Sequence, residues 1–333
     1  MASKNLFILV AMPPQARNLF SEELLQRLSQ AHPHVQTAMV EHQEHFEKLL
    51  PEADAVVIWP RSFRFPPHAL AQKTRLRWIQ SITAGVDALL TPELMVAEHI
   101  TITSTKGPMG PLMAEHIVLL MLALARDLPG FLQDRAARRW RFLSDERPMA
   151  QMYEKTIAIL GVGAVGGGLA RICKLGFGMR VLGMARTRRD NPHVDRYVDR
   201  MELHDALAEA DVVALCLALT PATTKIMDAA ALAAMKPTAY VINVARGALI
   251  DEEALIEALR TGRIAGAGLD ATVVQPLPAD SPLWTLPNVI ITPHVAPARE
   301  RANEYLVDFW CQNIHRFAAN EPLDGLVDRH AGY

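Results

Sequence analysis

The sequence predicts an α/β fold in which parallel strands alternate with helices. Short apolar runs rich in Val, Ile and Leu alternate with segments of helical spacing along most of the 333 residues, which is the pattern of parallel sheets. A glycine-rich turn from Gly161 to Gly166 follows one of these runs directly and opens a helical segment, a feature of doubly wound sheets. At roughly 150 residues per domain, the length predicts about two domains.

The first hundred residues form one α/β series. Strands are expected at residues 6–12, 35–39, 55–59, 77–79 and 101–103, and helices at 21–29 and 42–50. A strongly apolar helix is then expected at residues 112–126. Because it is apolar on every side, we expect it to be buried between domains.

A second series begins at residue 156. Its strands are expected at residues 156–160, 180–184, 212–217, 240–244, 265–269 and 289–292, and six strands with helices between them complete a doubly wound sheet. One long helical pattern, residues 299–319, follows and is expected to pack back on the first series. The prediction is therefore a central domain of residues 104–296 inserted in a discontinuous domain of residues 1–103 and 297–333.

Charge and composition exclude several classes of protein. The 34 basic and 36 acidic residues leave a formal net charge of −2, so neither nucleic acid nor an anionic membrane is an expected partner. The longest apolar run, residues 117–125, is far shorter than the roughly 20 residues of a membrane span. Three cysteines without metal-ligand spacing indicate a reducing, cytoplasmic setting and no metal site.

The glycine-rich turn predicts a dinucleotide site. Gly161, Gly163 and Gly166 form a GxGxxG pattern between a strand and a helix, where glycines permit a tight turn, close approach of a pyrophosphate and helix–strand packing. The helix N-terminus then stabilises the phosphates. A glycine turn without a ligand is the alternative reading.

The next strand ends without the carboxylate that would bind a ribose 2′-hydroxyl. Its end reads Ala185, Arg186, Thr187, Arg188, Arg189. Because arginines can pair with a 2′-phosphate in bidentate fashion, we expect NADP(H) to be preferred over NAD(H). The alternative reading is a solvated basic turn.

Three ionisable residues follow other predicted strands, at the edge where α/β sheets bind ligands. They are Arg246, Asp270 and His294. Arginine suits a substrate carboxylate, and histidine suits acid–base catalysis near neutral pH. A hydride transfer to a carbonyl needs both functions.

These segments resemble the D-isomer-specific 2-hydroxyacid dehydrogenases over nearly the whole chain. The similarity rests on residues 243–247, 251–255, 266–270, 276–278, 281–284 and 292–294, with the glycine loop, residues 81–87 and 114–116. Within the family the chain is most similar to glyoxylate/hydroxypyruvate reductases, as residues 58–60, Trp140 and residues 186–188 suggest. The family implies a Rossmann-type cofactor domain and a flavodoxin-like substrate domain that close over a cleft.

The resemblance also implies roles for individual residues. Arg246 would bind the substrate carboxylate and His294 would protonate the developing alkoxide. Substrate contacts would come from Ala84, Gly85, Val86, Trp59 and Trp140, the last by reaching a neighbouring subunit's site in a homodimer built around residues 112–126. Cofactor contacts would come from Gly161, Gly163, Ala164, Val165, Gly166, Arg186, Thr187, Arg188, Arg189, Leu219, Thr220, Pro221, Val244, Ala245, Arg246 and Asp270.

One residue departs from the family pattern. Most members pair the histidine with a glutamate five residues after the position of Asp270, where this chain has Gln275. Glutamine can orient the imidazole but adds no charge to stabilise its protonated form, so reduction should decline at lower pH than in glutamate-bearing relatives. Two alternatives stay open: formate oxidation, whose sister family also carries glutamine here, and a nucleotide-sensing binding protein on the same fold.

Overall fold

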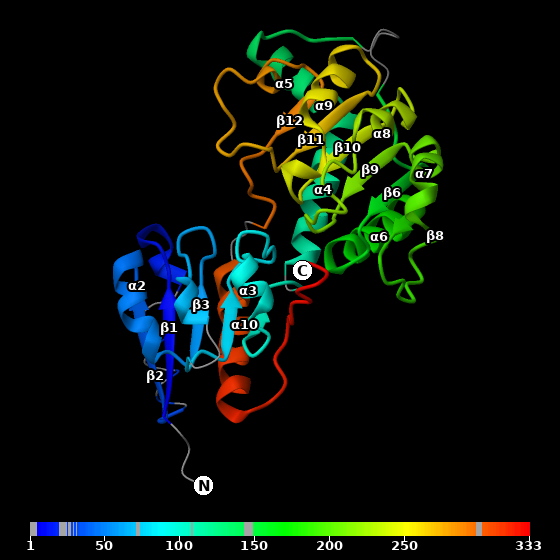
Figure 1. The fold of residues 1–333 in the computed structure, drawn as a ribbon. Coiled ribbons are helices and arrows are strands. Elements are labelled where there is room, and N and C mark those ends of the chain that lie inside the picture. The colour runs from blue at the N-terminus through cyan, green and yellow to red at the C-terminus, as the bar shows by residue number, and fades with distance from the viewer. Residues whose placement is uncertain are drawn as a thin grey trace. The chain divides into compact units, whose positions relative to one another are not determined.

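The computed structural model describes residues 5–19, 25, 28, 30, 32–70, 74–107, 109–142, 149–297 and 302–333. Its contacts divide the chain into two compact units, unit 1 (Met1–Pro108 with Glu300–Tyr333) and unit 2 (Met109–Arg299). Each unit contains one entirely parallel sheet. The predicted α/β class is confirmed (Figure 1). Most of the helix expected at residues 21–29 lies outside the described residues.

Unit 1 contains a five-stranded sheet in the order β2-β1-β3-β4-β5. Its strands are β1 (Leu6–Ala11), β2 (Val35–Val40), β3 (Ala55–Ile58), β4 (Trp78–Ser81) and β5 (Thr101–Thr103). This is the flavodoxin-like order, in which the first strand lies inside the sheet. The central strand β3 is buried along its whole length, as expected for a parallel sheet covered on both faces.

Helices cover both faces of this sheet (Figure 1). One face packs against α2 (Gln43–Leu49), the loop before α3 (Pro92–Val96) and α3 itself, through a core that includes Phe46 and Leu94. The other face packs against α10 (Ala302–Ala319), whose Trp310 and Ile314 are fully buried. Short 3-10 turns complete the unit: η1 (Pro14–Leu19), η2 (Leu50–Glu52) and η3 (Pro67–Leu70).

The C-terminal segment is tied to β5. Leu326 forms an antiparallel bridge with Thr103, and Ser104 N donates to Gly325 O at 2.9 Å. Gly325 has φ +74°, and a Cβ there would lie 2.2 Å from Ser104 O. Glycine is therefore required at this position for both conformation and space.

Unit 2 contains a seven-stranded sheet in the order β12-β11-β10-β9-β6-β7-β8. Its strands are β6 (Thr156–Leu160), β7 (Arg180–Met184), β8 (Arg196–Val198), β9 (Val212–Leu215), β10 (Tyr240–Asn243), β11 (Gly266–Leu269) and β12 (Val289–Ile291). The chain winds outward from β6 in one direction and from β9 in the other, so the topological switch point lies between these two strands. The prediction of six strands missed β8, an edge strand whose three residues include no apolar run.

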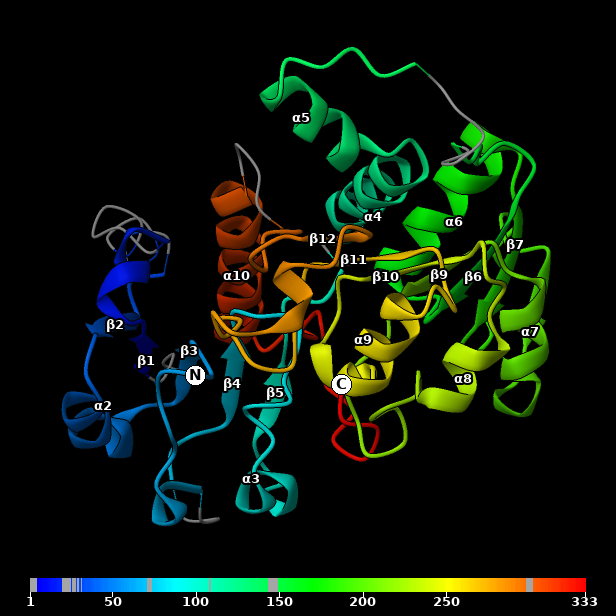
Figure 2. The ribbon, with the colours of Figure 1, turned by 90° about the horizontal axis from the view of Figure 1, so that it is seen from above.

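Two groups of helices enclose this sheet (Figure 2). One face carries α4 (Gly110–Ala125) and α6 (Ala164–Phe177), which pack on each other, and α5 (Leu128–Ala136) contacts α4. The other face carries α7 (Leu203–Glu209), α8 (Ala229–Ala234) and α9 (Glu252–Arg260). The 3-10 turns are η4 (Arg200–Glu202), η5 (Gly247–Leu249) and η6 (Pro282–Trp284).

Helix α4 was expected to be buried on every side, but part of its surface is exposed in this chain. Ala114, Ile117 and Met121 are buried against the sheet and α6, but Leu119 is 54% exposed in this single chain. Burial on one face needs only the i, i+3, i+4 positions, so the apolar residues on the outer face of α4 need another explanation. In the described residues, no helix has both the length and the apolar character needed to cross a bilayer.

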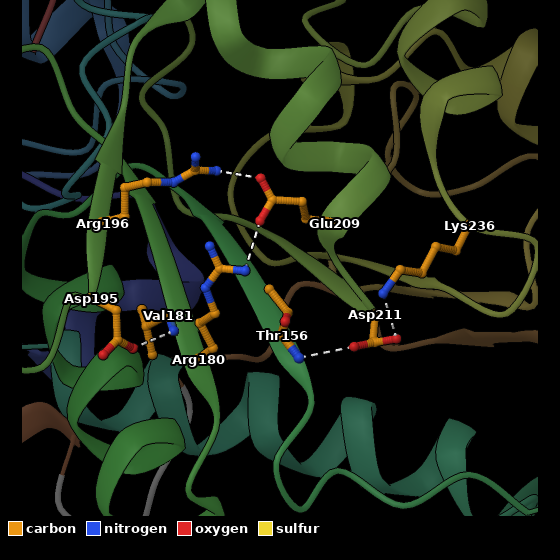
Figure 3. A network of polar contacts seen from close by, with 8 residues as sticks. All are labelled: Thr156, Arg180, Val181, Asp195, Arg196, Glu209, Asp211 and Lys236. Atoms are coloured by element: carbon orange, nitrogen blue, oxygen red, sulfur yellow. Dashed lines mark hydrogen bonds and ion pairs between the residues drawn. The ribbon is translucent and has the colours of Figure 1, made fainter.

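Charged residues stabilise the amino ends of the strands in unit 2 (Figure 3). Asp211 accepts hydrogen bonds from Thr156 N and Lys236 Nζ, at 2.9 and 3.0 Å, and Asp195 accepts one from Val181 N at 2.8 Å. Each aspartate directly precedes a strand and satisfies an amide at the start of the neighbouring strand, an otherwise unpaired donor. These interactions occupy the edge opposite to the carboxyl ends of the strands, where ligands bind.

Candidate active site

The carboxyl ends of the strands in unit 2 bring most of the predicted site residues to one edge. Because the sheet is parallel, the segments after β12, β11, β10, β6 and β7 follow one another along this edge. They carry His294, Asp270, Arg246, the glycine loop and the arginine cluster, in that order. Arg246, Asp270 and His294 therefore lie at one end of this edge, and the predicted phosphate-binding residues lie at the other end.

The glycine loop has the geometry of an anion site. Gly161 has φ +105°, and a Cβ there would lie 2.6 Å from Cys216 O, across the switch point. At Gly166 a Cβ would lie 2.0 Å from Gly161 O, so glycine is needed for the close approach of α6 to β6. A Cβ at Gly163 would meet nothing within 4 Å, so this position borders open space.

Helix α6 begins at Ala164, with Gly163 as its N-cap. No side chain caps the helix at Gly163. The first-turn amides of a helix attract anions when no side chain covers them. Burial, with Cys173 nearby, raises the pKa of the Cys216 thiol to about 12, so no thiolate opposes an anion beside Gly161. These residues fit a dinucleotide pyrophosphate, and the predicted contacts of Ala164 and Val165 with it stay a prediction.

The arginine cluster after β7 is exposed, as a surface-bound phosphate would require. One member already has a partner, because Arg188 Nη2 lies 2.6 Å from Asp199 Oδ1. Asp199 also belongs to the capping box that begins η4. Tyr197 donates a hydrogen bond to Arg189 O at 2.9 Å and so orders the turn. Asp199 could not be predicted as a partner of Arg188, since it lies eleven positions further along the chain and β8 lies between them.

The turn after β9 is ordered by its own hydroxyl groups. Thr220 N donates to Thr223 Oγ1 at 2.8 Å, and Thr223 Oγ1 donates to Ala218 O at 2.7 Å. Leu219 and Thr220 are half-buried and Pro221 is exposed. The predicted cofactor contacts of these residues stay a prediction.

Arg246 follows β10 in a turn that Asn243 organises. Asn243 Nδ2 donates to Arg246 O at 2.9 Å, and its Oδ1 accepts from Ala245 N at 3.0 Å. The next residue, Gly247, must be glycine, because a Cβ there would lie 2.1 Å from the backbone of Thr272. Arg246 is half-buried and donates from Nη1 to Ala245 O at 3.0 Å. Val244 and Ala245 are buried beside it.

His294 and Gln275 form a direct hydrogen bond. His294 Nδ1 and Gln275 Oε1 are 2.9 Å apart, and Gln275 Nε2 donates to Thr272 O at 3.1 Å. The donation to Thr272 O fixes the amide orientation, so Oε1 accepts a hydrogen bond from Nδ1–H. The neutral imidazole therefore carries its hydrogen on Nδ1, and Nε2 is the atom that gains and loses a proton.

Asp270 is enclosed by the loop that carries His294. Its Oδ1 accepts from Thr292 Oγ1 at 2.6 Å and from Val295 N at 2.9 Å, and its Oδ2 accepts from Ala296 N at 2.9 Å. The side chain has no exposed surface. The predicted contact of Asp270 with the cofactor stays a prediction, and the structure adds a role in shaping the loop.

The remaining predicted residues have different surroundings. In unit 1, the loop after β4 is ordered by hydrogen bonds from Thr83 Oγ1 to Gly85 O and from Leu89 N to Val86 O, both 2.8 Å. Ala84 in this loop is exposed, and Trp59 is half-buried. In unit 2, Trp140 is 84% exposed. It lies between Arg139 and Arg141, both paired with Asp134.

Known proteins resemble this chain in sequence and in fold. Residues 118–296 match the family described as "D-isomer specific 2-hydroxyacid dehydrogenase, NAD binding domain". A glyoxylate reductase of Pyrococcus furiosus is 32% identical over 97% of this chain and 95% of its own.

Two solved structures superimpose on the chain. A D-isomer specific 2-hydroxyacid dehydrogenase family protein from Aeromonas salmonicida is 34% identical, with a TM-score of 0.81 over 98% of this chain and 100% of its own. A D-isomer specific 2-hydroxyacid dehydrogenase from Xanthobacter autotrophicus, solved with NADPH and MES, is 31% identical, with a TM-score of 0.80 over 98% of this chain and 99% of its own.

Proposed function

The chain belongs to the D-isomer-specific 2-hydroxyacid dehydrogenase family, most like its glyoxylate reductases, and we propose that it is an NADP(H)-preferring reductase of glyoxylate or hydroxypyruvate. The observation that carries this proposal is the hydrogen bond between Gln275 and His294. It leaves Nε2 of the imidazole to exchange protons, at the edge of the sheet where β10 leads into Arg246. The retention of Arg246 and His294 argues for catalysis rather than for nucleotide sensing, whereas Gln275 is the one feature that would fit a loss of activity.

The residues of this edge divide the reaction between them. Arg246 supplies a planar guanidinium that binds a carboxylate and polarises the adjacent 2-oxo group. His294, when protonated, gives the Nε2 proton to the alkoxide that develops on the substrate. A reduced nicotinamide, when bound, supplies the hydride. The family resemblance assigns the backbone amides of Ala84, Gly85 and Val86, in unit 1, to the carboxylate oxygens of the substrate.

The exposed arginines after β7 support the preference for NADP(H). Arg186, Arg188 and Arg189 are a strong match for the charge of a 2′-phosphate, and the described strand end has no carboxylate for a 2′-hydroxyl. The related structure from Xanthobacter autotrophicus contains NADPH. The Arg188–Asp199 ion pair is a surface pair of about 0–1 kcal/mol, which a doubly charged phosphate can displace.

We also propose a homodimer formed through α4, α5 and the segment after α5. In the single chain this region exposes several large apolar side chains: Leu119, Leu128, Phe131, Leu132, Trp140 and Phe142. Apolar groups gathered in this way mark an interface that burial would stabilise. Trp140 is the member assigned to the partner's substrate site.

Oxidation of NADPH at 340 nm with a panel of 2-oxoacids tests the proposed activity. Glyoxylate and hydroxypyruvate should be reduced with a kcat/KM above that of bulkier 2-oxoacids, and NADPH should be used more efficiently than NADH. Arg246→Ala should act mainly on substrate KM and orientation, whereas His294→Ala should act mainly on kcat. Binding of NADPH without turnover of any 2-oxoacid would support the nucleotide sensor, and turnover of formate with NADP⁺ would support the formate dehydrogenase.

A further inference from the structure

A partly buried polar cluster adjoins the turn that carries His294. His116 is on α4, with its side chain 13% exposed, and its Nε2 lies 3.0 Å from Thr292 Oγ1 and 3.5 Å from Asp270 Oδ1. Thr292 Oγ1 in turn lies 2.6 Å from Asp270 Oδ1. The three side chains come from a helix, a strand end and a loop that are far apart in the sequence.

The hydrogens in this cluster can be placed from the number of available donors. A threonine hydroxyl has one hydrogen, and Thr292 uses it on the Asp270 carboxylate, which cannot donate when ionised. Thr292 Oγ1 must therefore accept at the 3.0 Å contact, so His116 Nε2 is the donor. Donation thus runs from the His116 ring to the Thr292 hydroxyl and on to the Asp270 carboxylate.

The carboxylate at the end of this chain also fixes two backbone amides. Asp270 accepts from Val295 N and Ala296 N, the two residues that follow His294. His294 itself has φ +56°, a left-handed conformation that costs a non-glycine residue energy and persists only where its surroundings enforce it. The hydrogen bonds of Asp270 therefore hold His294 in a backbone conformation that this residue would not adopt unaided.

We propose that His116 is a positioning residue for the proton transfer. By donating to Thr292, it fixes the hydroxyl that donates to Asp270, and Asp270 fixes the turn that presents His294 Nε2. His116 does not touch the reacting atoms in this scheme. Its catalytic consequence rests on the proposed role of His294 as proton donor, whereas its effect on the turn does not.

Substitutions at position 116 separate the ring's hydrogen bond from its bulk. His116→Gln places an amide donor near the position of Nε2, and His116→Leu removes the donor while keeping an apolar side chain of similar size. His204→Leu is the matched control, because His204 is an exposed histidine on α7, on the opposite face of the same sheet. Each variant is compared in kcat, in KM for NADPH and in hydrogen exchange of the amides of Val295 and Ala296.

We expect the three variants to differ in kcat and in amide exchange. His116→Leu should lower kcat about three- to tenfold, the range of one lost hydrogen bond, leave KM for NADPH within twofold, and speed exchange of the two amides. His116→Gln should restore most of both properties, and His204→Leu should change neither. Unchanged amide exchange in His116→Leu, or no rescue by His116→Gln, would overturn the proposal.

A double-mutant cycle with Thr292→Val tests whether the two residues act as one chain. If His116 acts through the Thr292 hydroxyl, adding His116→Leu to Thr292→Val should cause no further loss of kcat. Losses that multiply would overturn the proposal. The proposed function and the positioning role can fail independently. Wild-type protein that turns over no 2-oxoacid would refute the proposed function, while faster amide exchange in His116→Leu would still support the positioning role.

Discussion

Replacement of Gln275 by glutamate should move the pH profile of reduction to higher pH. The change puts a carboxylate oxygen where Gln275 Oε1 now lies, 2.9 Å from His294 Nδ1. Reduction needs the protonated imidazole, and a neighbouring negative charge stabilises that form. The pH at which the rate falls must therefore rise, and so must the pH at which the reverse oxidation begins.

The size of the shift follows from distance and exposure. Two unit charges about 4 Å apart interact by about 1 kcal/mol in water and about 4 kcal/mol at an effective dielectric constant of about 20. Gln275 is exposed and His294 half-buried, which favours the lower part of this range. At about 1.4 kcal/mol per pH unit, the midpoint should rise by about one unit. The variant also loses the donor to Thr272 O, so kcat can fall while the midpoint rises.

The assay is kcat/KM for glyoxylate reduction from pH 5 to 9, because this profile reports ionisations of the free enzyme. Gln275→Met is the control, since it removes the hydrogen bond and adds no charge. It should reduce the rate without moving the midpoint upward. A midpoint in Gln275→Glu that stays within 0.3 units of wild type, or falls, would refute the charge coupling between these two side chains.

Three further changes test other parts of the account. Asp199→Asn frees Arg188 and should lower KM for NADPH up to about fivefold, with KM for NADH unchanged, because a surface ion pair is worth at most about 1 kcal/mol. Gly325→Ala should lower the free energy of unfolding by about 1–3 kcal/mol in denaturant titration, since it combines a left-handed φ with a clash at Ser104 O. Leu119→Glu should shift the sedimentation equilibrium toward monomer, because a charge would be buried in the proposed interface.

Each of these variants has a matched control. Asp190→Asn removes an exposed carboxylate near the same arginines and should leave the NADPH preference unchanged. Gly262→Ala has a comparable φ of +68° but open space around the added methyl group, so it should cost less than Gly325→Ala. Leu175→Glu changes a residue of α6 that is 66% exposed and should leave the association state intact. Equal effects in variant and control would contradict the corresponding argument.

The fold class was predictable because strong local signals agree with the tertiary structure. Thr156–Leu160 and Arg180–Met184 form strands with the predicted bounds, since uninterrupted apolar runs of this length are buried on both faces of a sheet. The edge strand β8 was missed because half of it faces solvent and no apolar run marks it. The predicted domain boundaries and site residues stay predictions.

Long-range polar contacts could not be predicted from the sequence. Nothing in the spacing of His116, Asp270 and Thr292 indicates that the helix packs over the loop, and the pairing of Arg188 with Asp199 depends on β8 lying beside β7. The outer face of α4 illustrates the same limit, because composition alone cannot distinguish a helix buried within the chain from one covered by another subunit. Strand ends, by contrast, localise side chains to one edge once the sheet is known to be parallel.

Transfer of deuterium from NADPH labelled at both C4 positions would show directly whether this chain is a 2-oxoacid reductase. We expect glyoxylate to be converted to glycolate with one deuterium on C2, detected by mass spectrometry, and His294→Ala to slow this product's formation without weakening NADPH binding. Glycolate without deuterium, or NADPH that binds and is never oxidised by any 2-oxoacid, would contradict the assignment of this chain as a 2-oxoacid reductase.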